Sequence, residues 1–576
     1  MKISKYFSIG ALALTLGLSS CVGDLDLQPN DPNLVDPNAP DFKENTLAIC
    51  YSGIACEGIS GPGSSYVSGL DGGASAYLRL IFTLSEWCTD ECVWIWPNDE
   101  GGGAGDIDAC TWAANNTYLQ GAYYRLLGHI AICNQFLSNT KDDTDDVSME
   151  MKAEARVLRA YSYYNMLDLF GRSSFITEKA EIGEEPAQLT RPELYAWLVE
   201  ELKDIVDNSN IERTPVLGRV GLDGAEALLA KLYLNGEVWA GDTNAWKLCQ
   251  ERCENIIKRH AGTGFQGTGL AEHYLYLFCR ENNVYMPGGS KANENEILFG
   301  IAYNDTYTQS YGGPTFIISG TVTNSHYMPR QLYGCGSEWS CIKGKLQLAQ
   351  KFQGSLYTDD VRNDLWLQGG TNVYPAGGEG DDAWDAEDYS DEFHGFTGDW
   401  KTTGGNAIVK FTGRTPNAAW DGGWDMKQLP DGTWECGFPE TKFASTAQPI
   451  IRLADIYLMY TECYLQGNVG DQGKALEYWN NIRRRAGIDD LASSDFRLQG
   501  LMDERAREFY LESWRRNDLI RAGYFVGPNQ QLWQVKGGTD DSNVKTGTRI
   551  ADRNIVYPIP SAVLGAQPDF VQNEGY

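Results

Sequence analysis

The stretch EMKAEARVLRAYSYYNMLDLFG, residues 150–171, decides the class of fold to which this chain belongs. Its apolar and aromatic side chains recur every three or four residues, which is the spacing of one face of an α-helix. The members of this stripe are Val157, Ala160, Tyr161, Tyr164 and Leu167. Gly171 follows at a position where glycine commonly ends a helix. The stretch therefore predicts an amphipathic helix whose apolar face needs a partner.

Further stretches show the same periodicity. TRPELYAWLVEELKDIVDN has Thr190 as a candidate N-cap and Pro192 in its first turn. A candidate pair of helices, GAEALLAKLYLNGEVWAG and TNAWKLCQERCENIIKRH, is joined through Gly241 and Asp242. A last pair is IRLADIYLMYTECYLQGN and DQGKALEYWNNIRRRAG. Pairs in which small residues face aromatic ones are similar to tetratricopeptide repeats of about 34 residues. Because one pair cannot bury its own apolar face, neighbouring pairs must stack.

The fold is therefore predicted to be mostly α, with helical repeats at about residues 117–260 and 450–525. Two other segments, 58–116 and 265–450, are rich in Gly, Trp, Tyr, Asn and Asp and contain many turn signals. Long irregular loops on a rigid scaffold are where binding residues tend to lie. We expect a tetratricopeptide-like helical-repeat scaffold that carries two large, irregular, loop-rich insertions.

Residues 1–20 have the pattern of a lipoprotein signal peptide. Lys2 and Lys5 precede an apolar run that is too short to cross a bilayer, which requires about 20 residues. The run ends at a serine pair followed by Cys21, which resembles a bacterial lipobox, so Cys21 is predicted to carry the lipid. An ordinary cleaved signal followed by a chance cysteine is the alternative. Residues 21–40 are predicted to form an acidic, flexible tether.

Charge limits the classes of partner. The chain has 47 Lys and Arg against 78 Asp and Glu, a formal net charge of −31 at pH 7. Such a surface repels phosphate backbones and anionic lipids. We therefore expect no nucleic-acid partner, and a neutral ligand in preference to a polyanionic one.

The 14 cysteines include near pairs such as Cys88/Cys92 and Cys249/Cys253. In an exported protein some of them can form disulfides, although spacing alone does not define the pairing. The histidines do not flank the cysteines in the order of a zinc site. Most of these cysteines are expected to be structural or free thiols.

No metal or catalytic motif stands out. The stretch GGEGDDAWDAEDYSDEFHG offers oxygen ligands that calcium would accept, namely Asp381, Asp382, Asp385 and Asp388. Their spacing does not match an EF-hand loop, and a solvated loop is the simpler interpretation. The chain has no GxSxG, HExxH or P-loop motif. A glycosidase would need two carboxylates about 5–10 Å apart, and no barrel-like alternation of strands and helices supports one. We expect no cofactor and no enzymatic activity.

Aromatic residues in the loops are the candidate binding residues. A sugar presents flat apolar C–H faces ringed by hydroxyls, so its site needs an aromatic platform with polar groups beside it. In VWIWPNDEGGG, Trp94 and Trp96 would share one face of an extended segment, with Asn98 and Asp99 next to them. The alternative is a pair of core residues at the edge of a sheet.

Two further loop aromatics are candidates. Trp339 lies in YGCGSEWSC between Cys335 and Cys341, and Tyr303 lies in AYNDTY. Each of them has the alternative that a loop aromatic only covers the edge of a core. The tyrosines on the helical stripes, Tyr161 and Tyr164 among them, are instead expected to pack in the core.

These stretches, taken in order along the whole chain, resemble the SusD/RagB family of nutrient-binding outer-membrane lipoproteins of Bacteroidetes. The resemblance lies in the lipobox followed by DLDLQP, and in Thr89-Asp90-Glu91 before an aromatic loop. It continues through EARVLRAYSYYNMLDLFG, RLADIYLMYTECYLQGN, LEYWNNIRRRAGIDDL, ERAREFYLESWRRNDLIRAGYF and the ending YPIPSAVLGAQPDFVQNEGY.

The resemblance implies one SusD-like domain over residues 41–576, with helical repeats on one side and loops on the other. Members of the family cover TonB-dependent outer-membrane transporters of the SusC type and capture oligosaccharides for import. Their ligand aromatics follow the acidic stretch, where Trp94 and Trp96 lie here, and recur in the middle segment, where Trp339 lies. The lipid on Cys21 would hold the protein at the outer membrane, facing the cell surface. An inward orientation is the alternative, because Leu25 interrupts the acidic residues of the tether.

We therefore expect a surface lipoprotein that binds a neutral oligosaccharide and delivers it to a SusC-like transporter. A relative that binds peptides, or a purely structural lid subunit of the same kind of transporter, is the alternative.

Overall fold

The computed structural model describes residues 41–96, 103–181, 183–282, 296–322, 336–337, 339–357, 359–364, 373–374, 387–388, 408–413, 426–428, 434–436, 441–538 and 546–576. Residues Met1–Ala48 and Ile49–Tyr576 form separate units by their contacts. The predicted signal peptide, Cys21 and the tether lie outside the described residues.

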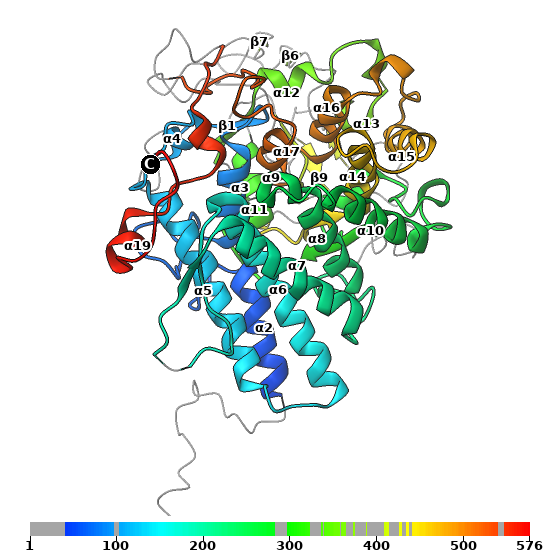
Figure 1. Ribbon diagram of the computed structural model, residues 1–576. Helices are drawn as coiled ribbons and strands as arrows, with labels where there is room; N and C mark the ends of the chain where they lie inside the picture. Colours follow the sequence, from blue (N-terminus) through cyan, green and yellow to red (C-terminus); the bar gives the residue numbers. More distant parts are fainter. Residues whose placement is uncertain are drawn as a thin grey trace, which may run out of the picture. The chain divides into compact units, whose positions relative to one another are not determined.

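A continuous array of helices forms the scaffold. Each helix packs against the next, so that α5 contacts α6, α6 contacts α7, α7 contacts α8 and α8 contacts α10 (Figure 1). The array then continues across a long intervening segment, since α14 packs on α10 and α15 packs on α14. The bounds are α5 Thr117–Asn139, α6 Asp146–Phe170, α7 Arg191–Asn208, α8 Leu222–Leu234, α9 Gly236–Ala240, α10 Ala245–His260, α14 Leu453–Leu465 and α15 Gln472–Arg485. The predicted mostly α fold with a helical-repeat scaffold is confirmed.

Local signals place the ends of these helices. The Thr190 N–H donates to the Glu193 carboxylate at 2.8 Å in a capping box at the start of α7. Asn116 and Asp145 accept backbone N–H groups at the starts of α5 and α6. Gly171 follows α6 with a φ of +69°, which only glycine adopts without strain. The predicted start at Thr190 and the predicted end at Gly171 are confirmed.

Helix α6 differs from its prediction in one respect. The sequence predicts one buried face, but from Ala153 to Phe170 nearly every side chain is buried, including charged ones. The reason is that α6 lies between α5 and α7 and also touches α8, so that it has no face toward solvent. Its buried Arg159 binds Glu201 of α7 at 2.8 Å, which satisfies a charge that burial would otherwise leave unpaired.

The loop-rich segments contain short helices and strands. The helices outside the array are α2 Phe42–Ala55, α3 Tyr77–Glu86, α4 Ala104–Asp108, α11 Gly313–Thr321, α12 Leu346–Gln350, α13 Val361–Asp364, α16 Leu498–Phe509, α17 Arg515–Arg521 and α19 Ser561–Ala566. Short 3-10 turns occur at Phe265–Gly267, Tyr274–Leu277, Ser355–Tyr357, Ser493–Asp495 and Asp552–Ile555.

Every sheet in the described part of the chain has two antiparallel strands. β4 (Ile297–Ile301) pairs with β10 (Gln448–Arg452), which runs directly into α14, so this pair attaches the middle segment to the array. β1 (Cys92–Trp94) pairs with β5 (Ile342–Gly344) and joins the two loop-rich segments. The remaining pairs are β2 Ser173–Phe175 with β3 Ala187–Leu189, β6 Val373–Tyr374 with β7 Glu387–Asp388, and β8 Met426–Gln428 with β9 Trp434–Cys436.

No disulfide joins two cysteines of the described part of the chain. Cys249 and Cys253 lie one helical turn apart on α10, with their sulfur atoms 3.9 Å apart and unbonded. Cys88 and Cys92 are also free and buried. Cys335, the near neighbour of Cys341 in the sequence, lies outside the described residues. Within the described residues, no helix combines the length and the apolar character needed to cross a bilayer.

Candidate functional site

The candidate site lies where the two loop-rich segments meet, at β1 and β5. Trp94 is the last residue of β1 and pairs with Ile342, and the Ile95 N–H donates to the Cys341 carbonyl at 2.9 Å. Trp96 follows β1, and Trp339 precedes β5. We call β1 and β5, together with Trp96 and Trp339 at their ends, the tryptophan sheet. Residues more than 240 positions apart in the sequence thus lie together.

Aromatic rings form one continuous cluster across this region. Trp87 stacks on Trp94 with ring centroids 4.8 Å apart, and Trp94 meets Trp96 edge-on at 5.7 Å. Phe316 of α11 connects the two halves, 6.1 Å from Trp94 and 6.3 Å from Trp339. Beyond Trp339 the cluster continues to Tyr311 at 6.0 Å and from there to Phe443 at 5.1 Å. Its members are Trp87, Trp94, Trp96, Phe316, Trp339, Tyr311 and Phe443.

Exposure divides the cluster into a base and a rim. Trp94 is only 1% exposed, and Trp87 and Phe316 are also buried. Trp96, Trp339 and Tyr311 are half-buried, so each presents part of its ring to solvent. Since a sugar needs an exposed ring face, the rim residues are the ones that can serve as platforms.

Trp94 is therefore buried, whereas its spacing with Trp96 predicted that both rings would be available to a ligand. Its indole N–H donates to the Trp96 carbonyl, and its ring is covered on both sides by other aromatic rings. The burial corresponds to the alternative interpretation, a core residue of a sheet. In this position Trp94 supports Trp96 from below and does not offer a face to a ligand.

Tyr303 is likewise buried, with 3% of its surface exposed. Its ring lies against the first residue of α11, where a Cβ added to Gly313 would be 2.5 Å from Tyr303 Cζ. The Gly313 φ of +53° allows this close approach. The ring is therefore packing under α11 and does not form a platform. Asn98 and Asp99 lie outside the described residues.

Polar groups gather beside the rim around Gly73. A Cβ at Gly73 would meet Tyr311 Cβ at 3.0 Å, Arg79 Nη1 at 3.1 Å and Asp71 Oδ1 at 3.3 Å, so these three residues converge there. Asp71 is exposed, and its carboxylate also accepts the Gly73 N–H at 2.9 Å. The Arg79 guanidinium is buried and lies 3.9 Å over the Phe316 ring, which is a cation–π contact.

Glu57 holds the backbone of Tyr311 in place. Its buried carboxylate accepts the Tyr311 N–H, the Gly63 N–H at 2.5 Å and the Ser310 hydroxyl at 3.1 Å. Burial raises the pKa of Glu57 above its usual value, although these hydrogen bonds oppose the increase. Lys442, which is exposed, places its ammonium 5.0 Å from the Tyr311 ring centroid at the outer end of the cluster.

The arrangement is therefore a strip of partly exposed aromatic rings on a rigid base, with a carboxylate and a cation at its edge. The same chain is 31% identical to the starch-binding protein SusD of Bacteroides thetaiotaomicron, over 100% of its own length and 99% of that protein.

The chain belongs to the SusD family. The family's own model matches residues 295–576 of this SusD-family protein. A SusD-like protein of Bacteroides ovatus is 24% identical over 70% of the chain and 65% of that relative. The same fold occurs in a SusD superfamily protein from Parabacteroides distasonis, with a TM-score of 0.64, 17% identity and coverage of 93% and 99%. The surface glycan-binding protein A of Bacteroides fluxus superimposes with a TM-score of 0.64 at 16% identity, with the same coverage.

Sequence reasoning missed the polar side of the site in this SusD-family protein. Arg79 could have been noticed in the sequence, because it is a lone charge in the otherwise apolar run YLRLIF. The sequence around Tyr311 is a weaker indication of a site residue, since Tyr311 precedes the Gly312-Gly313-Pro314 turn that starts α11. No sequence pattern indicates Asp71 or Phe443, because their place at the site depends on contacts between segments far apart in the chain.

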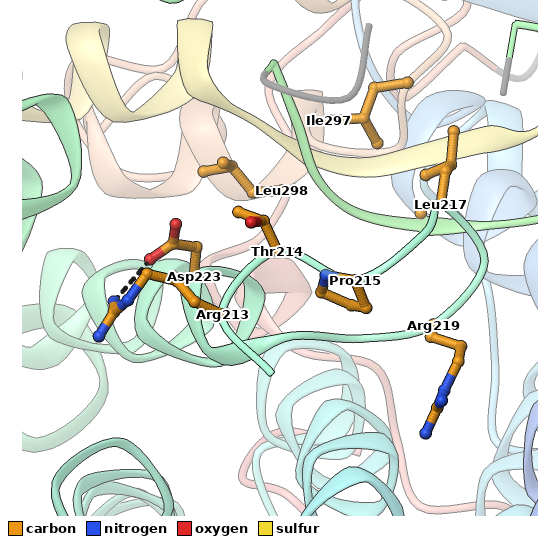
Figure 2. A pocket seen from close by; sticks show the side chains of 9 residues that line it. Arg213, Thr214, Pro215, Leu217, Arg219, Asp223, Ile297 and Leu298 are labelled. Atoms are coloured by element: carbon orange, nitrogen blue, oxygen red, sulfur yellow. Dashed lines mark hydrogen bonds and ion pairs between the residues drawn. The ribbon is translucent and has the colours of Figure 1, made fainter. Parts of the chain in front are cut away.

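Two small cavities lined by described residues lie outside this aromatic cluster. A cavity of about 20 Å³ is lined by Thr214, Pro215 and Leu298, with the Arg213–Asp223 ion pair on one side (Figure 2). A volume of this size holds about one water molecule, which excludes a sugar ring. A second cavity, beneath Trp514, measures about 10 Å³.

The described residues of this SusD-family protein contain no group of His, Cys, Asp and Glu side chains that could hold a metal ion. The calcium candidates Asp381, Asp382 and Asp385 lie outside the described residues, and only the backbone of Asp388 is described, in β7. The solvated loop expected there, and calcium as its alternative, both stay untested.

Proposed function

We propose that this protein is a surface lipoprotein that binds a neutral oligosaccharide through Trp96, Trp339 and Tyr311. The observation that carries the proposal is the half-exposed aromatic strip, whose rings are fixed by the tryptophan sheet and by Glu57. Stacked C–H faces would gain from the rings, and Asp71, with Asn98 nearby in sequence, would bond hydroxyls at the edge. The relatives named for starch binding and for glycan binding support the same class of ligand.

The net charge of the chain narrows the proposed class of ligand further. A net charge of −31 disfavours a polyanionic glycan, so a neutral one is the proposed class. The proposed role needs no chemical step, and incubation with the glycan should leave its chain length unchanged. A partner transporter of the SusC type would receive the captured oligosaccharide, and the anchor at Cys21 would raise the effective concentration of each weak contact.

The first test is affinity electrophoresis of the chain without residues 1–21, in gels that contain neutral or acidic polysaccharides. Trp96→Ala, Trp339→Ala and Tyr311→Ala should each abolish most of the retardation by the glycan that retards the wild type. Trp197→Ala is the matched control, because Trp197 is also half-buried but packs on Phe175 and Tyr163 of the scaffold. It should migrate as the wild type does.

A different outcome would favour a different function. If no glycan retards the wild type, while a peptide mixture does, the peptide-binding alternative replaces this proposal. If nothing is retained and the protein still copurifies with a membrane transporter, the structural lid is favoured. The anchor has its own test, since Cys21→Ser should move the protein from the membrane fraction to the soluble one.

A further inference from the structure

A tyrosine that the proposed site does not use presents part of its ring to solvent near the rim. Tyr66 lies in the loop between α2 and α3, and 38% of its surface is exposed. The guanidinium of Arg125, on α5, lies over its ring with Cζ 4.3 Å from the ring centroid, which is a cation–π contact. One face of the ring therefore rests on Arg125, and the opposite face is the one that a ligand can reach.

The support under Tyr66 is fixed, because Arg125 is buried and bound to the end of α2. Its Nη2 donates to the Gly53 carbonyl at 2.8 Å and to the Cys56 carbonyl, and its Nη1 donates to the Glu57 carbonyl at 3.1 Å. The end of a helix leaves carbonyls without partners, and the guanidinium supplies donors to them. Burial lowers the pKa of Arg125 to about 10, which still leaves the side chain charged at neutral pH.

Glu57 connects this support to the proposed site. Its carbonyl accepts Arg125, whereas its carboxylate accepts the N–H groups of Gly63 and Tyr311. The chain at Gly63 passes beside the Tyr311 ring, since a Cβ there would be 4.0 Å from Tyr311 Cε2. Tyr66 follows three residues later, and that length of chain spans at most about 11 Å. Tyr66 and Tyr311 therefore lie close to each other, and Glu57 binds the segments that carry both.

A hydrogen-bonding group lies beside the same loop. Gly72 packs directly on Gly63, since a Cβ at Gly72 would be only 2.4 Å from the Gly63 carbonyl oxygen. The neighbouring residue, Asp71, is exposed and is thereby held next to the chain that leads to Tyr66. A partly exposed ring with a carboxylate near it is the combination that a sugar residue needs.

We propose that Tyr66 is a further binding residue of the glycan site, where its free face stacks on a sugar residue beyond the one at Tyr311. The inference rests on the proposed glycan-binding function and extends the aromatic strip by one platform. An oligosaccharide that continues past Tyr311 gains a contact that a short one does not reach. The site therefore binds long oligosaccharides more tightly than short ones.

The test compares the affinities of the full chain, purified in detergent, for maltotriose and maltoheptaose by titration calorimetry. These two probes differ only in length, and they are fragments of the starch for which a 31% identical relative is named. The wild type should bind maltoheptaose more tightly than maltotriose. Tyr66→Ala should weaken the binding of maltoheptaose about three- to tenfold, as expected for one aromatic contact, and leave that of maltotriose unchanged.

Two further variants define the contact. Tyr66→Phe keeps the ring and should bind both probes as the wild type does. If it binds maltoheptaose as weakly as Tyr66→Ala, the hydroxyl makes the contact and stacking is overturned. Tyr478→Ala is the matched control, because Tyr478 is a partly exposed tyrosine that packs on Tyr457 and Tyr460 of the scaffold. It should keep both wild-type affinities.

The remaining outcomes separate this inference from the proposed function. A Tyr66→Ala variant with both wild-type affinities and a lower melting temperature would show that the ring only covers Arg125. Equal weakening for both probes would show that Tyr66 acts through the shape of the central site. Either result would overturn the inference and leave the proposed function standing. A wild type that binds neither probe would overturn the inference and exclude starch as the ligand, and the polysaccharide gels then decide the proposed function for other glycans.

Discussion

At the scale of single residues, solvent exposure distinguishes side chains that have equivalent positions in the sequence pattern. Trp94 and Trp96 lie two positions apart in the same short segment and touch each other, with ring centroids 5.7 Å apart. Trp94 is buried between Trp87 and Phe316, whereas Trp96 is half-buried at the rim. One ring therefore contributes to stability and the other remains available to a ligand.

Replacement of these two tryptophans should have opposite consequences. Trp94→Ala should lower the free energy of unfolding by about 3–5 kcal/mol, because it empties a fully packed position. Trp96→Ala should lower it by only about 1 kcal/mol, because Trp96 is already partly exposed to water, yet it should abolish most glycan retention. Urea denaturation measures the first effect and affinity electrophoresis the second. Equal loss of stability in both variants would contradict the division into base and rim.

At the scale of elements, α11 connects the middle segment to the tryptophan sheet. Phe316 on this helix joins the two halves of the aromatic cluster. The Ser319 carbonyl accepts the Trp339 N–H at 2.9 Å and the Ser340 N–H at 3.2 Å. The position of Trp339 therefore depends on where α11 begins, which Gly313 and the Tyr303 ring below it determine.

A side chain at Gly313 should displace α11. Gly313→Ala places a Cβ against the Tyr303 ring and requires a positive φ, so it should cost about 1–3 kcal/mol of stability and weaken glycan retention as well. Gly128→Ala is the control, because Gly128 is exposed on α5 and a Cβ there meets nothing within 4 Å. It should stabilise the protein by about 0.5–1 kcal/mol and leave retention unchanged. Thermal unfolding and affinity electrophoresis of the two variants check both expectations.

At the scale of the whole molecule, buried ion pairs join segments that are distant in sequence. Glu508 of α16 lies between three arginines, with contacts of 3.1 Å to Arg362, 3.0 Å to Arg452 and 2.5 Å to Arg485. Glu296, which directly precedes β4, binds Arg452 and Arg485 from the other side. Burial opposes ionisation of Glu508, but the arginines more than offset this and hold its pKa below the usual range.

Removal of the central carboxylate should be costly. Glu508→Gln leaves the arginines with too little negative charge in a dry interior, so it should lower the free energy of unfolding by about 3–5 kcal/mol. Glu477→Gln removes the exposed partner of Arg484 and should cost about 0–1 kcal/mol. Because the Glu508 pKa is lowered, its contribution is present above the unfolded-state value of about 4.3 and is lost as the pH falls. Chemical denaturation at pH 7 and pH 4 should therefore show a smaller loss on acidification in Glu508→Gln than in the wild type.

Part of this organisation was predictable from local patterns. A run of three arginines in an acidic chain favours pairing with carboxylates. Each member of Arg483-Arg484-Arg485 does pair in this way, with Glu504, Glu477 and Glu296 respectively. The helix ends at Thr190 and Gly171 were predictable because capping depends on a few adjacent residues. Trp96 and Trp339 became candidates because they lie in segments without helical periodicity, but nothing in the sequence indicated that Phe316 connects Trp94 to Trp339.

The sequence by itself determined the helical-repeat class of fold and the ends of its main helices, and it indicated the loop-rich segments that hold the candidate site. These properties depend on residues a few positions apart, whose spacing is visible in the chain. Only the tertiary structure decided that Trp94 and Tyr303 are buried while Tyr311 and Asp71 lie at the rim. Exposure arises from contacts between distant segments, for which local spacing carries no signal.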